Sequence, residues 1–175
     1  VVWTLDAATG DFLWARSTVE QNVMTGVDAE KRIGIVNPEV RSVIGEQVYI
    51  CPYLLGGINW QATAYNPDTN AIYAPLNNLC MDFTLNEVQP TIGAHHGSAR
   101  STPKIAEGAD GNVGSFTAIN ASTGEIMWQF DQRAGFPGSA LTTGGNLVFA
   151  VDDNRRLRAF DATTGDVLWE QVLNN

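Results

Sequence analysis

The sequence predicts an all-β fold, part of a β-propeller, because one hairpin pattern recurs along it and no long amphipathic helical pattern is evident. The segment 5–14 recurs almost residue for residue at 160–169, and a third copy at 119–128 keeps the spacing. A degenerate fourth copy spans 65–73. Repetition of one small unit indicates that neighbouring units stack to bury a shared core.

Each copy has the chemistry of a β-hairpin. Alternating apolar residues lead to an Asp or Asn that can hold a turn, followed by Thr and then a Gly that tolerates positive φ. In the fourth copy Asn70 replaces this glycine, and Asn is the next-best residue for a left-handed position. The aromatic residue that ends the second strand is expected on the buried face, clamping one sheet onto its neighbour.

The spacing of the turns predicts about four blades. They begin 60, 54 and 41 residues apart, near the roughly 40–50 residues of a four-stranded blade plus insertions, at Asp6, Asn66, Asn120 and Asp161. Further strands are expected within 31–50 and 146–160. The segment 86–114, rich in Gly, Pro, Ser and charge, predicts a long insertion loop at a rim.

Composition and net charge exclude some classes of protein. With 44% hydrophobic and 17% charged residues, the 175-residue chain is expected to fold as one partial propeller domain, 1–175. No apolar run approaches the roughly 20 residues of a membrane span. The net charge of -9 disfavours binding to nucleic acid. It is consistent either with docking of a basic protein partner or with a role in solubility alone. The chain opens inside a strand pattern at Val1, without Met or a signal peptide, so we expect a piece of a longer polypeptide.

The segment Ala159 to Trp169 resembles the tryptophan-docking motif of quinoprotein dehydrogenases. A second set of residues resembles the methanol and ethanol dehydrogenase class in particular: Cys51-Pro52, Gly56 to Gln61, Ala64 to Pro67, Tyr73, Pro75 and Asn77 to Asp82. The segments 144–149 and 154–161 resemble the C-terminal blades of these enzymes. Cofactor-free propellers, including outer-membrane assembly scaffold lipoproteins, carry related repeats, so a non-catalytic binding scaffold is the alternative.

The resemblance implies four blades of an eight-bladed propeller that holds pyrroloquinoline quinone (PQQ) near its axis, bridged by Ca²⁺ or a lanthanide. Such an enzyme oxidises an alcohol to an aldehyde and passes electrons to a cytochrome c-type acceptor. The catalytic Asp and the metal ligands of the family lie upstream of the matched part. No catalytic or metal-binding residue is therefore assigned within 1–175.

Asn59 is the strongest candidate for a cofactor contact. It lies in a Gly-Gly-x-Asn-Trp turn, where Gly56 and Gly57 are expected to allow close approach of the backbone to a flat ligand. The resemblance implies that its amide hydrogen-bonds the quinone, and the alternative is a turn Asn that satisfies its own backbone. Trp60 is expected either beside the cofactor or in packing between blades.

Phe136 stands where the resemblance to methanol dehydrogenases implies the sequence Trp-Gly-Gly-Thr, whose Trp stacks on the quinone in that family. The resemblance implies that the Phe136 ring stacks in its place, and the alternative is an aromatic residue of a rim loop.

Cys51 and Cys80 are the only cysteines and lie 29 positions apart. They match a bridge found in the methanol dehydrogenase class, which implies a disulfide that pins the Asn59 segment. A disulfide indicates an oxidising compartment, here the periplasm. Two buried free thiols are the alternative.

Two polar clusters are not expected to be sites. His95 and His96 are adjacent and so point in opposite directions on a strand, without ligands at metal spacing. A second cluster near two acidic residues predicts a solvated hairpin with local ion pairs, and it contains Arg155, Arg156 and Arg158 beside Asp152 and Asp153.

Overall fold

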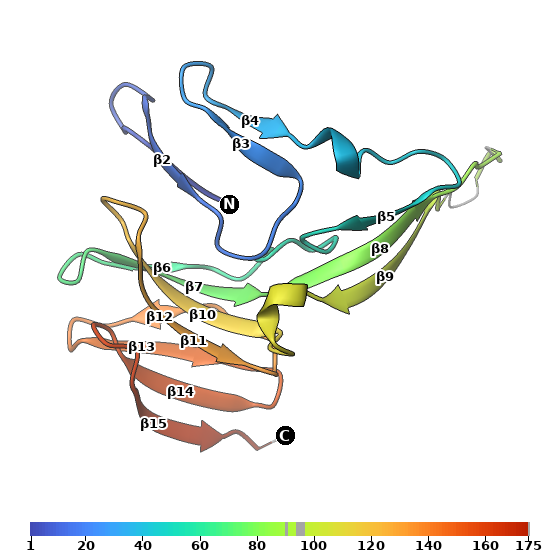
Figure 1. Cartoon of the computed structure of the whole chain (residues 1–175). Helices are drawn as coiled ribbons and strands as arrows, with labels where there is room; N and C mark the ends of the chain where they lie inside the picture. Colours follow the sequence, from blue (N-terminus) through green and yellow to red (C-terminus); the bar gives the residue numbers. More distant parts are fainter. Residues whose placement is uncertain (90, 94–96, 175) are drawn as a thin grey trace.

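A computed structural model describes residues 1–89, 91–93 and 97–174 and shows β-strands joined by turns, with two single-turn 3-10 helices. No helix within these residues has the length and apolarity to cross a bilayer. The predicted all-β propeller fold is confirmed, and Figure 1 shows the N-terminal hairpins and the C-terminal sheet at opposite ends of the fold, with the other two sheets between them.

Two four-stranded antiparallel sheets form complete blades. The first has the order β11-β10-β7-β6 and comprises β6 (Ala64–Asn66), β7 (Ala71–Asn77), β10 (Gly114–Asn120) and β11 (Ile126–Gln132). The second comprises β12 (Leu141–Thr142), β13 (Leu147–Val151), β14 (Arg156–Asp161) and β15 (Val167–Val172) in chain order. The first strands of the two blades, β6 and β12, lie beside each other, and the Ala140 N–H donates to the Ala62 carbonyl at 2.9 Å just before them. The blades therefore converge along their β6 and β12 edges.

Three smaller sheets complete the fold. They are the hairpin β1 (Val2–Leu5) and β2 (Phe12–Arg16), the hairpin β3 (Met24–Asp28) and β4 (Ile33–Val36), and the sheet of β5 (Gln47–Ile50), β8 (Leu79–Leu85) and β9 (Ala99–Ile105). The 3-10 helices are η1 (Pro38–Val40) and η2 (Glu107–Ala109). The strands predicted within 31–50 and 146–160 are confirmed as β4, β5, β13 and β14.

The repeated turns do not each mark a separate blade. Those at Asn66 and Asn120 belong to one sheet, since they join β6 to β7 and β10 to β11. In a four-stranded meander the first and third turns lie at the same end, so both can carry the same turn chemistry. The turns at Asn66 and Asn120 therefore mark one blade, and the described residues form two complete four-stranded blades and three smaller sheets.

The predicted insertion loop over 86–114 is also wrong in part. The strand β9 pairs with β8 from Leu79 opposite Ile105 to Leu85 opposite Ala99. The sequence of β9 is polar and contains Pro103, and both features are unfavourable by β-strand propensity. An edge strand of a sheet tolerates such a proline, and β9 is an edge strand.

Aromatic residues join the blades, as the repeat predicts. The Trp128 indole N–H donates to the Ala162 carbonyl at 3.0 Å, and the Tyr73 hydroxyl donates to the same oxygen at 2.9 Å. Both rings belong to a buried core that also contains Phe116 and Phe160. This core fixes the first blade against the second.

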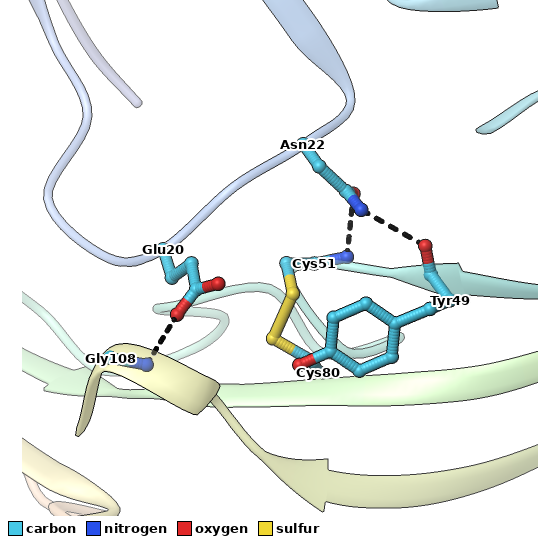
Figure 2. Close-up of a disulfide and its surroundings, with 6 residues drawn as sticks. All are labelled: Glu20, Asn22, Tyr49, Cys51, Cys80 and Gly108. Carbon is cyan, nitrogen blue, oxygen red and sulfur yellow. Dashed lines mark hydrogen bonds between the residues drawn. A yellow bond between two sulfur atoms is a disulfide. The ribbon is translucent and has the colours of Figure 1, made fainter. Parts of the chain in front are cut away.

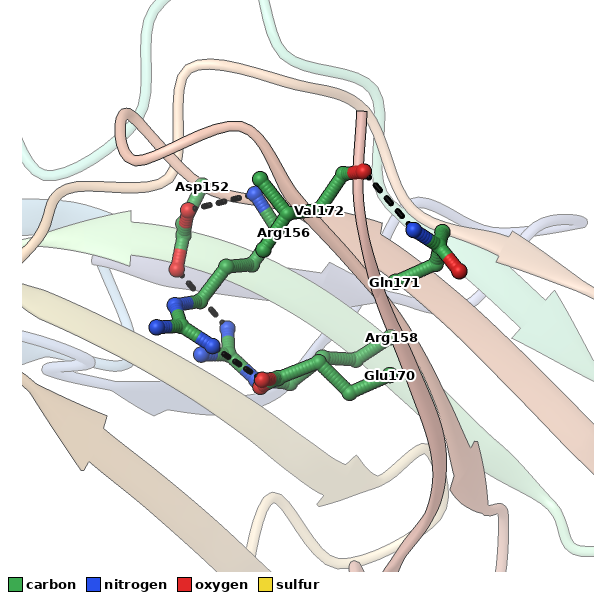
Figure 3. A network of polar contacts seen from close by, with 6 residues as sticks. All are labelled: Asp152, Arg156, Arg158, Glu170, Gln171 and Val172. Carbon is green, nitrogen blue, oxygen red and sulfur yellow. Dashed lines mark hydrogen bonds and ion pairs between the residues drawn. The ribbon is translucent and has the colours of Figure 1, made fainter. Parts of the chain in front are cut away.

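Arg158 is buried, which corrects the expectation that it lies on a solvated hairpin. Its guanidinium pairs with Asp152 at 2.8 Å and with Glu170 at 2.6 Å, as Figure 3 shows. It also lies 5.3 Å from the centre of the Phe130 ring on the neighbouring blade. Arg156, by contrast, is half-exposed and pairs with Glu170. The two arginines are two residues apart and so share a face of β14; they differ because Arg158 lies in the buried middle of the strand, whereas Arg156 lies at its exposed start.

Candidate functional site

The segment 51–61 lies in the connection from β5 to β6 and carries the candidate residue Asn59. Its start is fixed by the predicted disulfide, which is present between Cys51 and Cys80. Both cysteines are buried, and Cys80 belongs to β8. The bridge therefore attaches the segment to the three-stranded sheet.

Hydrogen bonds from Asn22 hold the same point, as Figure 2 shows. Its Oδ1 accepts from the Cys51 N–H at 2.8 Å, and its Nδ2 donates to the Tyr49 carbonyl at 2.9 Å. Burial raises the pKa of the Tyr49 phenol, with a smaller contribution from nearby Glu20, so this ring stays neutral beside the disulfide. Glu20 lies near both sulfurs, but disulfide-bonded sulfurs are not available as metal ligands, so this group is not a metal site.

Gly56 and Gly57 are required for reasons of the fold. Gly56 has a φ of +71°, a conformation that side chains disfavour. A Cβ on Gly57 would lie 2.7 Å from Cγ2 of Val19. The expectation that Gly57 leaves space for a ligand is therefore corrected, because Val19 occupies that space.

Asn59 is an exposed residue of this turn. Its backbone N–H donates to Oε1 of Gln61 at 2.9 Å, so Gln61 satisfies the turn. Among the described residues, nothing hydrogen-bonds the Asn59 side-chain amide. The alternative of a turn Asn that satisfies its own backbone does not fit this geometry.

A cavity of about 190 Å³ opens beside this amide. Asn59, Trp60 and Asp153 line it, together with Tyr53, Leu55, Gly56, Ile58, Gln61, Asn77, Leu79 and Pro137. Trp60 is 67% exposed, so its ring does not pack between the two complete blades. The cavity thus offers an amide and an open indole face, which suit the oxygens and flat rings of a planar quinone.

The ring of Phe136 lies elsewhere. It is fully buried in the core, 5.7 Å from the centre of the Phe116 ring, and presents no face to a ligand. Its backbone nevertheless supports the cavity wall: the Phe136 N–H donates to Oδ1 of Asn77 at 3.0 Å, and its carbonyl accepts from Gln61 at 3.4 Å. In this conformation Phe136 contributes by positioning and not by stacking.

Among the lining residues that were not singled out as cofactor contacts from the sequence are Gln61, Asn77 and Asp153. Gln61 and Asn77 stood within the motif string that resembles methanol dehydrogenases, and that was the one available signal. Asp153 comes from the turn between β13 and β14, about 90 residues farther along, so only the fold brings it to the cavity.

A larger cavity, of about 310 Å³, lies between the 17–20 loop, η2 and β11. Its wall includes the carboxylates of Glu20, Asp110 and Asp131. These charges disfavour an anionic cofactor such as a quinone tricarboxylate. It contains none of the predicted contact residues, and His95 and His96 lie outside the described residues.

Comparisons with known proteins agree with the fold. The family model described as outer membrane protein assembly factor BamB matches residues 56–175. The chain is 30% identical to the lanthanide-dependent methanol dehydrogenase of Methylacidiphilum fumariolicum, over 99% of this chain and 29% of the relative. It is 33% identical to the quinoprotein alcohol dehydrogenase PedH of Pseudomonas putida, over 96% of this chain and 29% of that protein. A europium-containing methanol dehydrogenase matches in structure with a TM-score of 0.89 at 30% identity, over 98% of this chain and 30% of that one.

These findings define a β-propeller built from tryptophan-docked blades. The chain belongs to the propeller family described as outer membrane protein assembly factor BamB. The predicted resemblance to quinoprotein alcohol and methanol dehydrogenases is confirmed by the relatives and the structural match. The chain spans about three tenths of the length of these relatives.

Proposed function

We propose that this chain is part of a PQQ-dependent dehydrogenase that oxidises alcohols to aldehydes, and that it supplies one wall of the cofactor site. The observation that carries the proposal is the Asn59 amide, which lines a cavity without a partner among the described residues. Bound PQQ supplies the two-electron acceptor for the oxidation. Ca²⁺ or a lanthanide is the proposed metal, held by residues outside 1–175.

The residues of the chain have distinct tasks in this proposal. Asn59 donates a hydrogen bond to a cofactor oxygen, and Trp60 covers part of a cofactor ring. Gln61 and Asn77 position the turn through the Phe136 backbone. The disulfide holds the start of the turn, which reduces the conformational freedom of the free site.

We also propose a periplasmic location and a cytochrome c-type electron acceptor. The disulfide supports an oxidising compartment, since such bonds are rare in the cytosol. The net charge of -9 supports a basic partner, which it would attract before contact.

The second candidate function is a non-catalytic binding scaffold, and the description of the matching family model favours it. A scaffold does not require an unpartnered amide in a cavity. Reconstitution of the full-length protein with PQQ and Ca²⁺ or a lanthanide, followed by dye-linked oxidation of a panel of alcohols, separates the two. Activity supports the dehydrogenase, whereas absence of both quinone binding and activity supports the scaffold.

Variants of the full-length protein test the role of Asn59. Asn59→Ala is expected to weaken PQQ binding by at least about tenfold, because a hydrogen bond to a charged or polarised oxygen is worth about 1.5–3 kcal/mol. Leu54→Ala is the control, since Leu54 is exposed in the same turn but does not line the cavity. Equal PQQ affinity for Asn59→Ala and the parent protein would contradict the assignment of Asn59.

A further inference from the structure

The buried disulfide lies next to a carboxylate. One oxygen of Glu20 and the sulfur atoms of Cys51 and Cys80 all lie within 4.8 Å of one another, and Figure 2 shows the three side chains together. The sulfurs do not ligate a cation while they are bonded to each other, because the thiolate is the form that binds metals. Reduction removes this obstacle and frees both cysteines of the chain at one place.

Hydrogen bonds to the backbone keep the two cysteines adjacent without the bridge. Oδ1 of Asn22 accepts from the Cys51 N–H at 2.8 Å, and the Asn22 N–H donates to the Cys51 carbonyl at 3.1 Å. Cys80 lies in β8, the middle strand of its sheet, between β5 and β9. The Tyr53 N–H donates to the Leu79 carbonyl at 2.6 Å, which joins the segment after Cys51 to the residue before Cys80. The thiols of the reduced chain are therefore expected to stay side by side.

Glu20 is held in place as a third ligand. Its Oε2 accepts from the Gly108 N–H at 3.1 Å, and a carboxylate that accepts one hydrogen bond retains lone pairs for a cation. Zn²⁺ binds thiolate sulfur at about 2.3 Å and carboxylate oxygen at about 2.0–2.2 Å, so two ligands of one ion lie less than about 4.6 Å apart. The spacing of at most 4.8 Å in the oxidised chain is close to that limit, so small movements of the side chains suffice.

A cavity lies against this group. Glu20, Ala106 and Ala109 line the cavity of about 310 Å³, and both alanines also pack with the two cysteines. The carboxylates of Asp110 and Asp131 lie in the same wall, so the cavity attracts cations and disfavours anions. Three protein ligands leave the fourth position of a tetrahedral ion for a water molecule from this cavity.

We propose that reduction of the bridge creates a binding site for a thiophilic divalent cation such as Zn²⁺, with the Cys51 and Cys80 thiolates and the Glu20 carboxylate as ligands. Thiolates select Zn²⁺ over Mg²⁺ and Ca²⁺. The reductant is a dithiol, which becomes a disulfide itself and transfers two electrons and two protons to the bridge, so that two thiols form. The cation then displaces both thiol protons into the solvent.

Two consequences follow from this site. A bound cation occupies both sulfurs, so it blocks re-formation of the bridge until the cation is removed. The site is also separate from the cavity beside Asn59, and it does not depend on the proposed dehydrogenase function.

Titration of the 175-residue chain with Cd²⁺ tests the site, after reduction with a dithiol and removal of the reductant without air. The reduced chain is expected to bind one Cd²⁺, seen as ultraviolet charge-transfer absorption of the cadmium–thiolate bonds, and Zn²⁺ is expected to displace it. The oxidised chain should show no such absorption. Glu20→Gln keeps an oxygen that can accept from the Gly108 N–H but removes the anionic ligand. This variant should bind at least about tenfold more weakly, since loss of an outer partner of a metal ligand already costs about 10–100-fold.

Asp110→Asn is the matched control, because it removes the same charge from the same cavity without touching the three ligands. Its affinity for Cd²⁺ should stay close to that of the parent chain. Zn²⁺ should also raise the urea midpoint of the reduced parent chain, since a cation that binds only the folded form stabilises it. Absence of cadmium–thiolate absorption in the reduced chain would overturn the proposal. An affinity unchanged by Glu20→Gln, or lowered equally by Asp110→Asn, would do the same.

Discussion

The carboxylate of Asp152 and the guanidinium of Arg158 pair at 2.8 Å in the last blade, where their side chains are 1% and 7% exposed. Arg158 adds a second carboxylate, that of Glu170, and approaches the Phe130 ring of the preceding blade. The pair therefore lies at a junction between blades, where a change to one member leaves the other charge buried.

Arg158→Met is expected to lower the free energy of unfolding by about 3–5 kcal/mol, because Asp152 loses its partner while it remains buried. Arg156→Met is the matched control and should cost less than about 1 kcal/mol, since the pair of Arg156 with Glu170 is half-exposed. Urea denaturation of both variants provides the measurement. Equal losses for the two arginines would contradict the role of the buried pair.

Stability is expected to fall in acid. Burial raises the pKa of Asp152, but hydrogen bonds from the Arg156 N–H and the Arg158 guanidinium outweigh it, so the net pKa is lowered. Backbone N–H bonds lower the pKa of Asp6 and Asp161 in their turns. A carboxyl group with a lowered folded pKa stabilises the fold above its unfolded pKa of about 3.9, and this contribution is lost as the pH falls through the folded value. Urea midpoints should therefore be steady from about pH 6 to 7 and decline below about pH 4.

Asp161→Asn isolates the contribution of one turn to this decline. Asn120 holds the equivalent turn with a neutral amide whose Oδ1 accepts from Ser122 and Thr123 at 2.9 and 3.1 Å. The Asn variant should thus keep the turn and show a shallower loss of stability in acid. Asp161→Ala removes the acceptor and should lower stability at every pH. If the Asn variant instead declined as steeply as the parent chain, Asp161 would not contribute to the acid transition.

The hairpin turns could be predicted from the sequence because their chemistry is local. The acceptor side chain and the N–H donors of the turns at Asp6, Asn120 and Asp161 lie within three residues of each other. The glycine that takes positive φ lies only about four residues after the acceptor in each turn. Such patterns survive in any context, and they led correctly to the propeller class.

Features that depend on distant partners could not be predicted in this way. Gly57 is a glycine because Val19 packs against it, and Phe136 is in the core because Phe116 lies beside it. Trp128 and Trp169 end the same motif, yet only the first is buried, because a further blade follows it in the described chain. Burial of a repeated residue thus depends on its neighbours and not on its motif.

Loss of the disulfide is expected to lower the free energy of unfolding by about 3–4 kcal/mol on the chain-entropy model, for a sequence separation of 29 residues. Urea unfolding with and without a reductant measures this difference. The double variant Cys51→Ala with Cys80→Ala should be as unstable as the reduced parent chain and should not respond to the reductant. A parent chain whose unfolding midpoint is the same under both conditions would rule out the bridge as a stabilising element.

Comparison of two glycines measures how much the docked ring of Trp128 restricts the turn beneath it. Gly10 and Gly165 have φ of +72° and +79°, so an alanine carries a similar backbone strain of about 1–2 kcal/mol at either position. At Gly165, however, the new Cβ would also meet the Trp128 ring at 2.6 Å, whereas at Gly10 the nearest atom is 3.7 Å away. Gly165→Ala is therefore expected to cost at least about 1 kcal/mol more than Gly10→Ala in urea denaturation, because overpacking adds about 1–3 kcal/mol. Gly145→Ala, where φ is not positive and the nearest atom is 3.8 Å away, should be nearly neutral. Equal losses of stability at Gly10 and Gly165 would mean that the ring of Trp128 moves aside freely. The contact of Trp128 with the turn would then not hold the two blades in a fixed arrangement.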